Sequence, residues 1–125
     1  MRILLDSHTL LWWMDDPNRI NPNARAEISH PRNEVFASAV SIWEIGLKTS
    51  KGKLRIPENF TDFLPENGIQ ILPFTGAHAQ ASIKLPPHHG DPFDRALIAQ
   101  CQVESMTFAT RNSMAANYQI GLLEI

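Results

Sequence analysis

The sequence is poor in cysteine, in net charge and in long apolar runs. Cys101 is the single cysteine among 125 residues, which excludes an internal disulfide and a metal site built from several cysteines. The formal net charge of −2 is too small for a protein that coats nucleic acid, because such proteins are clearly basic. No apolar run approaches the roughly 20 residues needed to cross a bilayer, and the start at Met1-Arg2-Ile3 lacks the pattern of a signal peptide. We therefore expect a cytoplasmic protein with no membrane partner.

The composition nevertheless favours a folded core. Hydrophobic residues make up 43% of the chain, a share too high for a mostly disordered protein of small net charge. The length falls in the usual range of one domain and is too short for two full cores. We expect a single domain over residues 1–125.

Short apolar runs alternate with helical patterns along the whole chain. Strands are expected at Arg2–Leu5, Glu34–Ala37, Ile69–Leu72, Met106–Ala109 and Gly121–Glu124. Helices are expected at Ser7–Met14, Pro22–Ser29, Ala39–Thr49, Pro57–Leu64, Gly76–Lys84 and Pro92–Glu104. This alternation predicts the α/β class, with a central, mainly parallel sheet flanked by helices. In such sheets, ligands bind beyond the carboxyl ends of the strands, where the strand order reverses.

Carboxylates stand at the expected ligand edge. Asp6 directly follows the first strand and could serve as a helix N-cap, worth about 1 kcal/mol, or as part of a functional site. Asp91 and Asp94 open the last long helix with the same two possibilities. Asp91 suits the N-cap before Pro92, and the helix dipole favours Asp94 in the first turn. Since one carboxylate is enough to cap a helix, Asp94 is free to point toward the site.

A narrow polar stripe interrupts an otherwise apolar helix. Ser41, Glu44 and Lys48 follow one another at spacings of three and four residues, which places them on one helical face. Either this face lines a cleft within the fold, or Glu44 and Lys48 form an exposed ion pair worth about 0.3–0.5 kcal/mol. Both interpretations stay open on the sequence.

Convergence of Asp6, Glu44 and Asp94 would have a chemical consequence. Carboxylates about 4–5 Å apart repel one another by ~3–4 kcal/mol per pair at an effective dielectric constant near 20. Such a cluster requires protons or a cation, and oxygen ligands without His or Cys select Mg²⁺ or Mn²⁺. The matching reaction is metal-assisted hydrolysis of a phosphodiester.

Several segments resemble PIN-domain ribonucleases, specifically the VapC-type toxins of toxin–antitoxin pairs, and they follow one another along the chain in the order expected of that family. The most specific match is HGDPFDRALIAQ, which covers His89–Gln100. The others are LLDSHTLLWW at Leu4–Trp13, SAVSIWEI at Ser38–Ile45 with Lys48, the tripeptide Gly52-Lys53-Leu54, and ATRN at Ala109–Asn112. The resemblance covers essentially the whole chain.

The resemblance implies a PIN-like three-layer fold over the single domain, and cleavage of RNA at clustered acids with Mg²⁺, for which Mn²⁺ is a plausible substitute. Matched position by position, Asp6, Glu44 and Asp94 would be the catalytic and metal-binding acids. Asp91 matches a further aspartate, which caps the helix or supports the site. The partners implied are a second copy of the chain, as a homodimer, and an antitoxin protein whose tail covers the site.

One position departs from the family pattern. Asparagine stands at position 112, where the family usually has aspartate after Thr110-Arg111. The Asn112 carbonyl could bind the metal directly or through a water, but the site has one negative charge fewer. A PIN-fold binding module, catalytically weakened at Asn112 and acting through its partner or RNA contacts, is therefore the alternative to an active ribonuclease.

Other polar residues near the acids have two possible roles each. Ser7, Ser41 and Thr110 could support the ligands or orient metal-bound waters, or they could merely cap and terminate elements. Arg95 and Arg111 could contact the substrate phosphate or hold the carboxylates by salt bridges, and Lys48 could also contact phosphate. The basic run formed by Lys48, Lys51, Lys53 and Arg55 is either a solvated helix end or a rim that guides RNA.

The remaining histidines and tryptophans give weaker indications. Adjacent His88 and His89 without cysteine partners are a weak zinc signal. We expect His8 and His78 to pack or form hydrogen bonds, and one of Trp12 and Trp13 to be exposed for a partner while the other joins the core. An aspartyl-phosphate phosphotransferase with Asp6 as nucleophile is a third hypothesis, which His8 disfavours because such enzymes commonly have an acid at that position.

Overall fold

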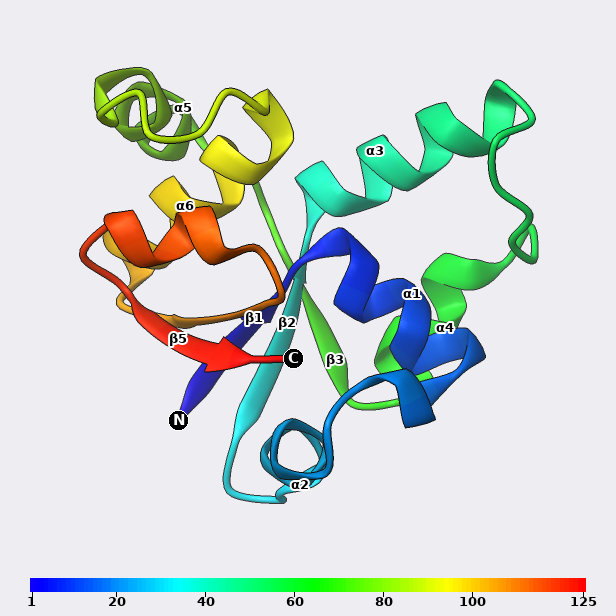
Figure 1. Cartoon of the computed structure of the whole chain (residues 1–125). Helices are drawn as coiled ribbons and strands as arrows, with labels where there is room; N and C mark the ends of the chain where they lie inside the picture. Colours follow the sequence, from blue (N-terminus) through cyan, green and yellow to red (C-terminus); the bar gives the residue numbers. More distant parts are fainter.

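Five short strands form one parallel sheet in the order β3-β2-β1-β4-β5 (Figure 1). The computed structural model describes residues 1–125. The strands are β1 (Arg2–Leu5), β2 (Glu34–Ser38), β3 (Ile69–Leu72), β4 (Thr107–Thr110) and β5 (Gly121–Glu124). All four neighbouring pairs are parallel, which confirms the expected sheet and the α/β class.

Six α-helices and two short 3₁₀ helices connect the strands. They are α1 (Ser7–Asp15), η1 (Pro17–Arg19), α2 (Pro22–Ser29), α3 (Ala39–Ser50), α4 (Phe60–Glu66), α5 (Gly76–Lys84), α6 (Pro92–Glu104) and η2 (Ser113–Asn117). N-caps form at Asn21, Ser38 and Thr75, whose side chains accept backbone N–H groups of α2, α3 and α5. None of these helices is long and apolar enough to cross a membrane.

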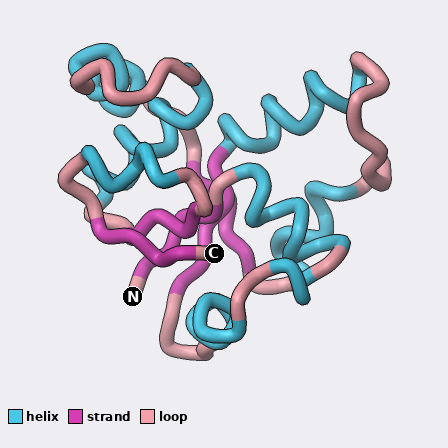
Figure 2. The backbone as a smooth tube through the Cα atoms, viewed as in Figure 1, coloured by secondary structure: helices cyan, strands magenta, loops and turns pink.

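Helices cover both faces of the sheet, so the fold has three layers (Figure 2). Side chains alternate along each strand: Ile3 and Leu5 join one core with residues of α1, α2 and α4. Leu4 joins the opposite core, whose largest contribution is the buried run Ala96–Ala99 of α6. Cys101 is buried in this second core and forms no disulfide.

A few element boundaries differ from the predictions. Helix α4 begins at Phe60 and not at Pro57, because Pro57 precedes a turn closed by the Phe60 N–H on the Pro57 carbonyl, at 3.1 Å. Strand β4 begins one residue later than expected, at Thr107, the residue that pairs with Ile3 of β1. The helices η1 and η2 were not predicted; each is too short to show a helical repeat in sequence.

The strand order places a crevice at the centre of the sheet. From β1 the chain moves outward to β2 and β3, then returns across β1 to β4 and β5 on the other side. The connections that follow β1 and β4 therefore diverge, and their first residues border the same space. Asp6 follows β1 and Arg111 follows β4, as the sequence places them.

Candidate active site

Asp6 is both a helix cap and a residue of the central crevice. Its Oδ1 accepts the Thr9 N–H at 2.7 Å, which caps α1, and its Oδ2 accepts the Thr110 hydroxyl at 2.6 Å. The residue is buried, with 6% exposure. The two interpretations of Asp6 therefore do not exclude one another, because the two hydrogen bonds leave further lone pairs on the carboxylate.

Asp94 lies in the first turn of α6, and Asp91 carries out the capping. Asp91 Oδ1 accepts the N–H groups of Phe93 at 2.8 Å and Asp94 at 3.2 Å. The Asp94 carboxylate is left for other contacts, and its Oδ2 lies 2.8 Å from His89 Nε2. Sequence reasoning thus assigned the cap correctly to Asp91.

Asp6 and Asp94 line one pocket of about 360 Å³ at the crevice, together with His8, Trp12, Arg111 and Asn112. Burial raises the pKa of Asp94; the hydrogen bond from His89 opposes this rise, and the nearby negative charges of Asp91 and Asp6 add to it. Two carboxylates that influence one another in a partly desolvated pocket favour a bound cation.

Glu44 is buried but does not line this pocket. Its Oε1 accepts the Ser7 hydroxyl at 2.6 Å, and its Oε2 lies 2.9 Å from Lys48 Nζ. The structure contains no group of three His, Cys, Asp or Glu side chains arranged as metal ligands. The expected meeting of all three acids is therefore not formed in this structure; mutual repulsion favours separate protein partners, Lys48 for Glu44 and His89 for Asp94.

Asn112 requires a correction. Its Oδ1 accepts the Met114 N–H at 2.9 Å and caps η2, so this oxygen is not directed at the carboxylates. Its amide nitrogen faces the pocket, 3.3 Å from Asp94 Oδ2 and 2.6 Å from His89 Nε2. Asn112 thus offers hydrogen-bond donors to the site, and its carbonyl is not placed as a metal ligand.

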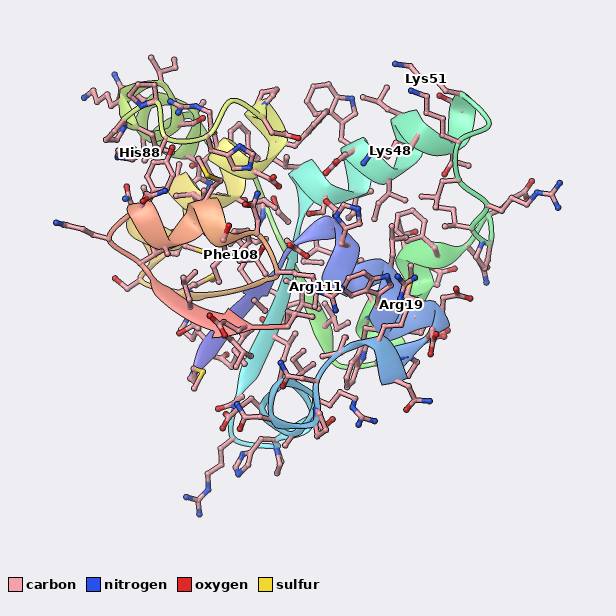
Figure 3. The ribbon with its side chains drawn as sticks, in the orientation of Figure 1. Arg19, Lys48, Lys51, His88, Phe108 and Arg111 are labelled. Atoms are coloured by element: carbon pink, nitrogen blue, oxygen red, sulfur yellow. The ribbon has the colours of Figure 1, made fainter.

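The two arginines beside the acids take different positions. Arg95 points away from the pocket, and its guanidinium donates to four backbone carbonyls between Ser82 and His89. The expectation that Arg95 contacts a substrate phosphate is therefore corrected, because its donors are occupied by the loop. Arg111 lines the pocket, lies over the Trp12 ring at 4.3 Å, and donates to the Arg19 carbonyl at 3.1 Å (Figure 3).

Comparison with known proteins agrees with this architecture. The family model of the PIN domain matches residues 3–120. The chain belongs to the PIN domain family. A curated relative, Ribonuclease VapC22 of Mycobacterium tuberculosis, is 27% identical over 100 residues, which are 78% of this chain and 76% of that protein.

Solved structures confirm the PIN fold. VapBC2 from Rickettsia felis, bound to a promoter DNA fragment, has a TM-score of 0.75 at 15% identity and covers 99% of this chain and 98% of its own. VapBC-1 from nontypeable Haemophilus influenzae has a TM-score of 0.69 at 15% identity, with coverages of 99% and 98%. A toxin–antitoxin complex from Klebsiella pneumoniae has a TM-score of 0.65 at 18% identity, with coverages of 98% and 99%. At these identities, the likeness shows the fold alone.

Within this PIN domain, hydroxyl groups hold the acids in place. Thr110 donates to Asp6 and accepts the Asn112 N–H at 3.0 Å, so it links the ends of β1 and β4. Ser7 orients Glu44. Ser41 is fully buried, and its hydroxyl has no hydrogen-bond partner. The stripe of Ser41, Glu44 and Lys48 thus faces the interior at its first two positions and the solvent at Lys48.

His89 is the site residue that sequence reasoning missed. It contacts Asp94 and Asn112 from the loop before α6, while the neighbouring His88 packs edge-on against Tyr118 at 5.2 Å. The two histidines therefore do not form a zinc site together. The signal available in sequence was the position of His89, two residues before the Asp91 cap, whose N–H donates to His89 Nδ1 at 3.3 Å.

Two aromatic predictions also change. His8 is exposed and lines the pocket, whereas His78 is buried and its Nδ1 accepts the Thr75 N–H at 3.0 Å, as expected of a hydrogen-bonding residue. Trp12 and Trp13 are both partly buried against the core. The most exposed tryptophan is Trp43, at 62%.

The donor set suits a hard divalent cation, the kind that PIN-domain ribonucleases generally use. Asp6 and Asp94 offer carboxylate oxygens in one pocket, whereas Ser7 and Lys48 engage the two oxygens of Glu44. No sulfur ligand is near, and His89 is engaged with Asp94, so oxygen chemistry dominates. Asp6 and Asp94 are therefore the residues that would hold such an ion, and a role for Glu44 beside them stays a prediction.

Proposed function

We propose that this protein is a metal-dependent endoribonuclease that acts as the toxin of a toxin–antitoxin pair, with Mg²⁺ as its ion and Mn²⁺ as a substitute. The observation that carries the proposal is the pocket at the strand-order reversal, which Asp6 and Asp94 both line although they lie far apart in the sequence. A relative named as a ribonuclease and structural neighbours solved as toxin–antitoxin complexes support it.

The proposed reaction is hydrolysis of an RNA phosphodiester. Water supplies the oxygen that bonds to phosphorus, the bond from phosphorus to the leaving oxygen breaks, and a proton passes to that leaving oxygen. A bound divalent ion would polarise the phosphate and lower the pKa of water. The protein holds Asp6 through Thr9 and Thr110, holds Glu44 through Ser7, and presents the positive charge of Arg111 at the pocket.

The Asp6→Asn variant tests this proposal. We expect purified wild-type protein to cleave RNA with Mg²⁺ or Mn²⁺ and to arrest growth on expression, and Asp6→Asn to lose at least ~100-fold in cleavage rate and to relieve the arrest. Asp16→Asn, which removes an exposed carboxylate just after α1 that caps no helix through its side chain, is the matched control. If wild-type protein cleaves no RNA with either ion, or if Asp6→Asn still arrests growth, the proposal is wrong.

The position of the Asn112 amide keeps the weakened binding module as a second candidate, because this group donates to Asp94 and brings no negative charge. In Asn112→Asp, a third carboxylate would face Asp94. We expect a gain of about ten-fold in Mn²⁺ affinity, measured by calorimetry, as each 1.4 kcal/mol of added attraction is tenfold. If cleavage also rises steeply, the natural site is weakened; if cleavage is unchanged, it is intact.

The proposed partners follow from the same function. An antitoxin protein would inhibit the site, and RNA would be the substrate. The protein would work as a homodimer in the cytoplasm, where its RNA targets are.

A further inference from the structure

A second concavity adjoins the acidic pocket. It has a volume of about 630 Å³ and lies between α1, the end of α3, and α4 with its preceding loop. The apolar part of its lining includes Leu11, Trp12, Leu54, Ile56, Phe60 and Phe63. We call this concavity the α1–α4 groove. Its size falls in the range of sites that take small molecules or single monomers of a polymer.

The groove has a positive rim. Arg19, Lys48, Lys53 and Arg55 line it, against two acids, Asp15 and Glu66. Lys48 is paired with Glu44, and Arg19 lies over the Trp12 ring at 4.8 Å. Lys53 and Arg55 are exposed and make no ion pair, so their charges are available to a ligand. A net excess of cations above an apolar, aromatic floor is the combination that binds single-stranded nucleic acid.

The groove and the acidic pocket have two lining residues in common. His8 and Trp12 line both, and Arg111 of the acidic pocket lies over the same Trp12 ring that Arg19 covers from the groove. Figure 3 shows Arg19 and Arg111 close together beside α1. A polymer strand whose phosphate lies at Asp6 and Asp94 can therefore continue directly into the groove.

We infer that the α1–α4 groove binds the nucleotide of a single-stranded RNA next to the phosphate that is cut. The base lies on the apolar floor, and Lys53 and Arg55 contact the following phosphates. This inference rests on the proposed RNA cleavage and names the segment of substrate that this face recognises. A protein segment would also suit the apolar lining of the groove. The unpaired cations Lys53 and Arg55, and the residues that the groove shares with the acidic pocket, favour the RNA strand.

The test compares two double variants, each of which replaces two positively charged side chains by glutamine. The groove pair is Lys53→Gln with Arg55→Gln; the control pair is Lys51→Gln with Arg32→Gln, two exposed cations outside the groove. The probe is a fluorescein-labelled single-stranded RNA of about eight nucleotides, with binding read by anisotropy in EDTA so that no cleavage occurs. Cleavage is measured separately with Mn²⁺.

We expect the groove pair to weaken RNA binding by roughly ten-fold and to reduce the slope of log Kd against log salt by about 1.4, since each lost phosphate contact removes ~0.7. KM should rise while kcat stays near the wild-type value, because the acids are untouched. The control pair should change Kd less than two-fold. A 4-thiouridine placed next to the cleaved phosphate should cross-link to the segment that contains Trp12 or to α4.

Several outcomes would overturn the inference. If the wild type cleaves RNA and the two pairs bind the probe equally well, the groove assignment fails while the ribonuclease proposal stands. If the groove pair keeps its RNA affinity but loses a protein that co-purifies with the wild type, the groove belongs to that protein partner. If the wild type neither binds nor cleaves RNA, the proposed function itself fails.

Discussion

At the scale of single residues, ionised Asp94 lowers the stability of the folded protein. Burial raises the pKa of Asp94, the His89 hydrogen bond offsets part of this effect, and the charges of Asp91 and Asp6 add to it. In the folded protein, Asp94 therefore holds its proton to a higher pH than it does in the unfolded chain. Stability in the absence of metal consequently falls as the pH rises through this interval. A cation would reverse this penalty, because it stabilises the charged form.

Asp94→Asn removes this penalty. We expect the variant to melt a few degrees above the wild type near pH 7 in EDTA, and the difference to vanish below the ordinary pKa of aspartate, where both side chains are neutral. Mn²⁺ should raise the Tm of the wild type and leave that of the variant unchanged. Differential scanning calorimetry across pH measures both effects.

Asp15→Asn serves here as a control for the loss of one negative charge, since Asp15 is exposed. Equal changes in Tm for the two variants would show that net charge, and not the buried position of Asp94, is responsible.

At the scale of elements, Arg95 organises the loop that carries His89. Its guanidinium donates to the carbonyls of Ser82, Leu85, Pro86 and His89 at 2.9 to 3.3 Å. These bonds connect the end of α5 to the start of α6. A segment rich in proline, which has few N–H groups of its own for internal hydrogen bonds, is thereby fixed in one conformation. Since His89 contacts Asp94, Arg95 acts on the site through the loop and does not touch the substrate.

Arg95→Gln should therefore destabilise the protein by about 2–4 kcal/mol, because four loop carbonyls, three of them in partly buried hydrogen bonds, lose a charged donor that a shorter amide cannot replace. Urea unfolding followed by circular dichroism measures this change. The loop should also become sensitive to proteases under native conditions.

Lys84→Gln, an exposed cation at the end of α5, should stay within about 0.5 kcal/mol of the wild type. A comparable loss in this control, or an unchanged stability in Arg95→Gln, would contradict the role given to Arg95.

At the scale of the whole molecule, one surface pocket is lined mainly by apolar residues and by no charged side chain. Residues of α3, α5 and α6 enclose a shallow pocket of about 390 Å³, with Trp43, Phe74 and Ile83 among its lining. Trp43 packs edge-on against Phe93 at 5.2 Å, and Ile83 is 81% exposed. An exposed apolar surface of this kind suits contact with another protein. In the expected homodimer, this surface of each copy would lie in the interface.

Ile83→Glu tests this contact. In a symmetric dimer, the substitution introduces two charges into the interface, so the dimer dissociation constant should rise at least ~100-fold. Light scattering after size-exclusion chromatography would then show a monomer with an unchanged circular dichroism spectrum.

Val103→Glu is the matched control, because Val103 is an exposed apolar residue of α6 outside this pocket. If Ile83→Glu forms the same dimer as the wild type, the second copy binds elsewhere.

Much of this molecule follows from local sequence. The alternation of short apolar runs with capped helical segments determined the α/β class, and caps such as Asn21 and Ser38 act within a few residues of their own position. The placement of Asp6 and Asp94 at the ligand edge followed from the same reasoning, because each acid directly follows or opens an element. The PIN-domain resemblance rests on these same local segments.

Only the tertiary structure decided which groups meet across long sequence distances. It directed Arg95 to loop carbonyls, turned the Asn112 amide nitrogen and not its oxygen toward Asp94, and brought His89 to that carboxylate. The reason is physical: a cap or a strand is selected by neighbours along the chain, whereas the partner of a buried polar group is selected by every element that packs around it.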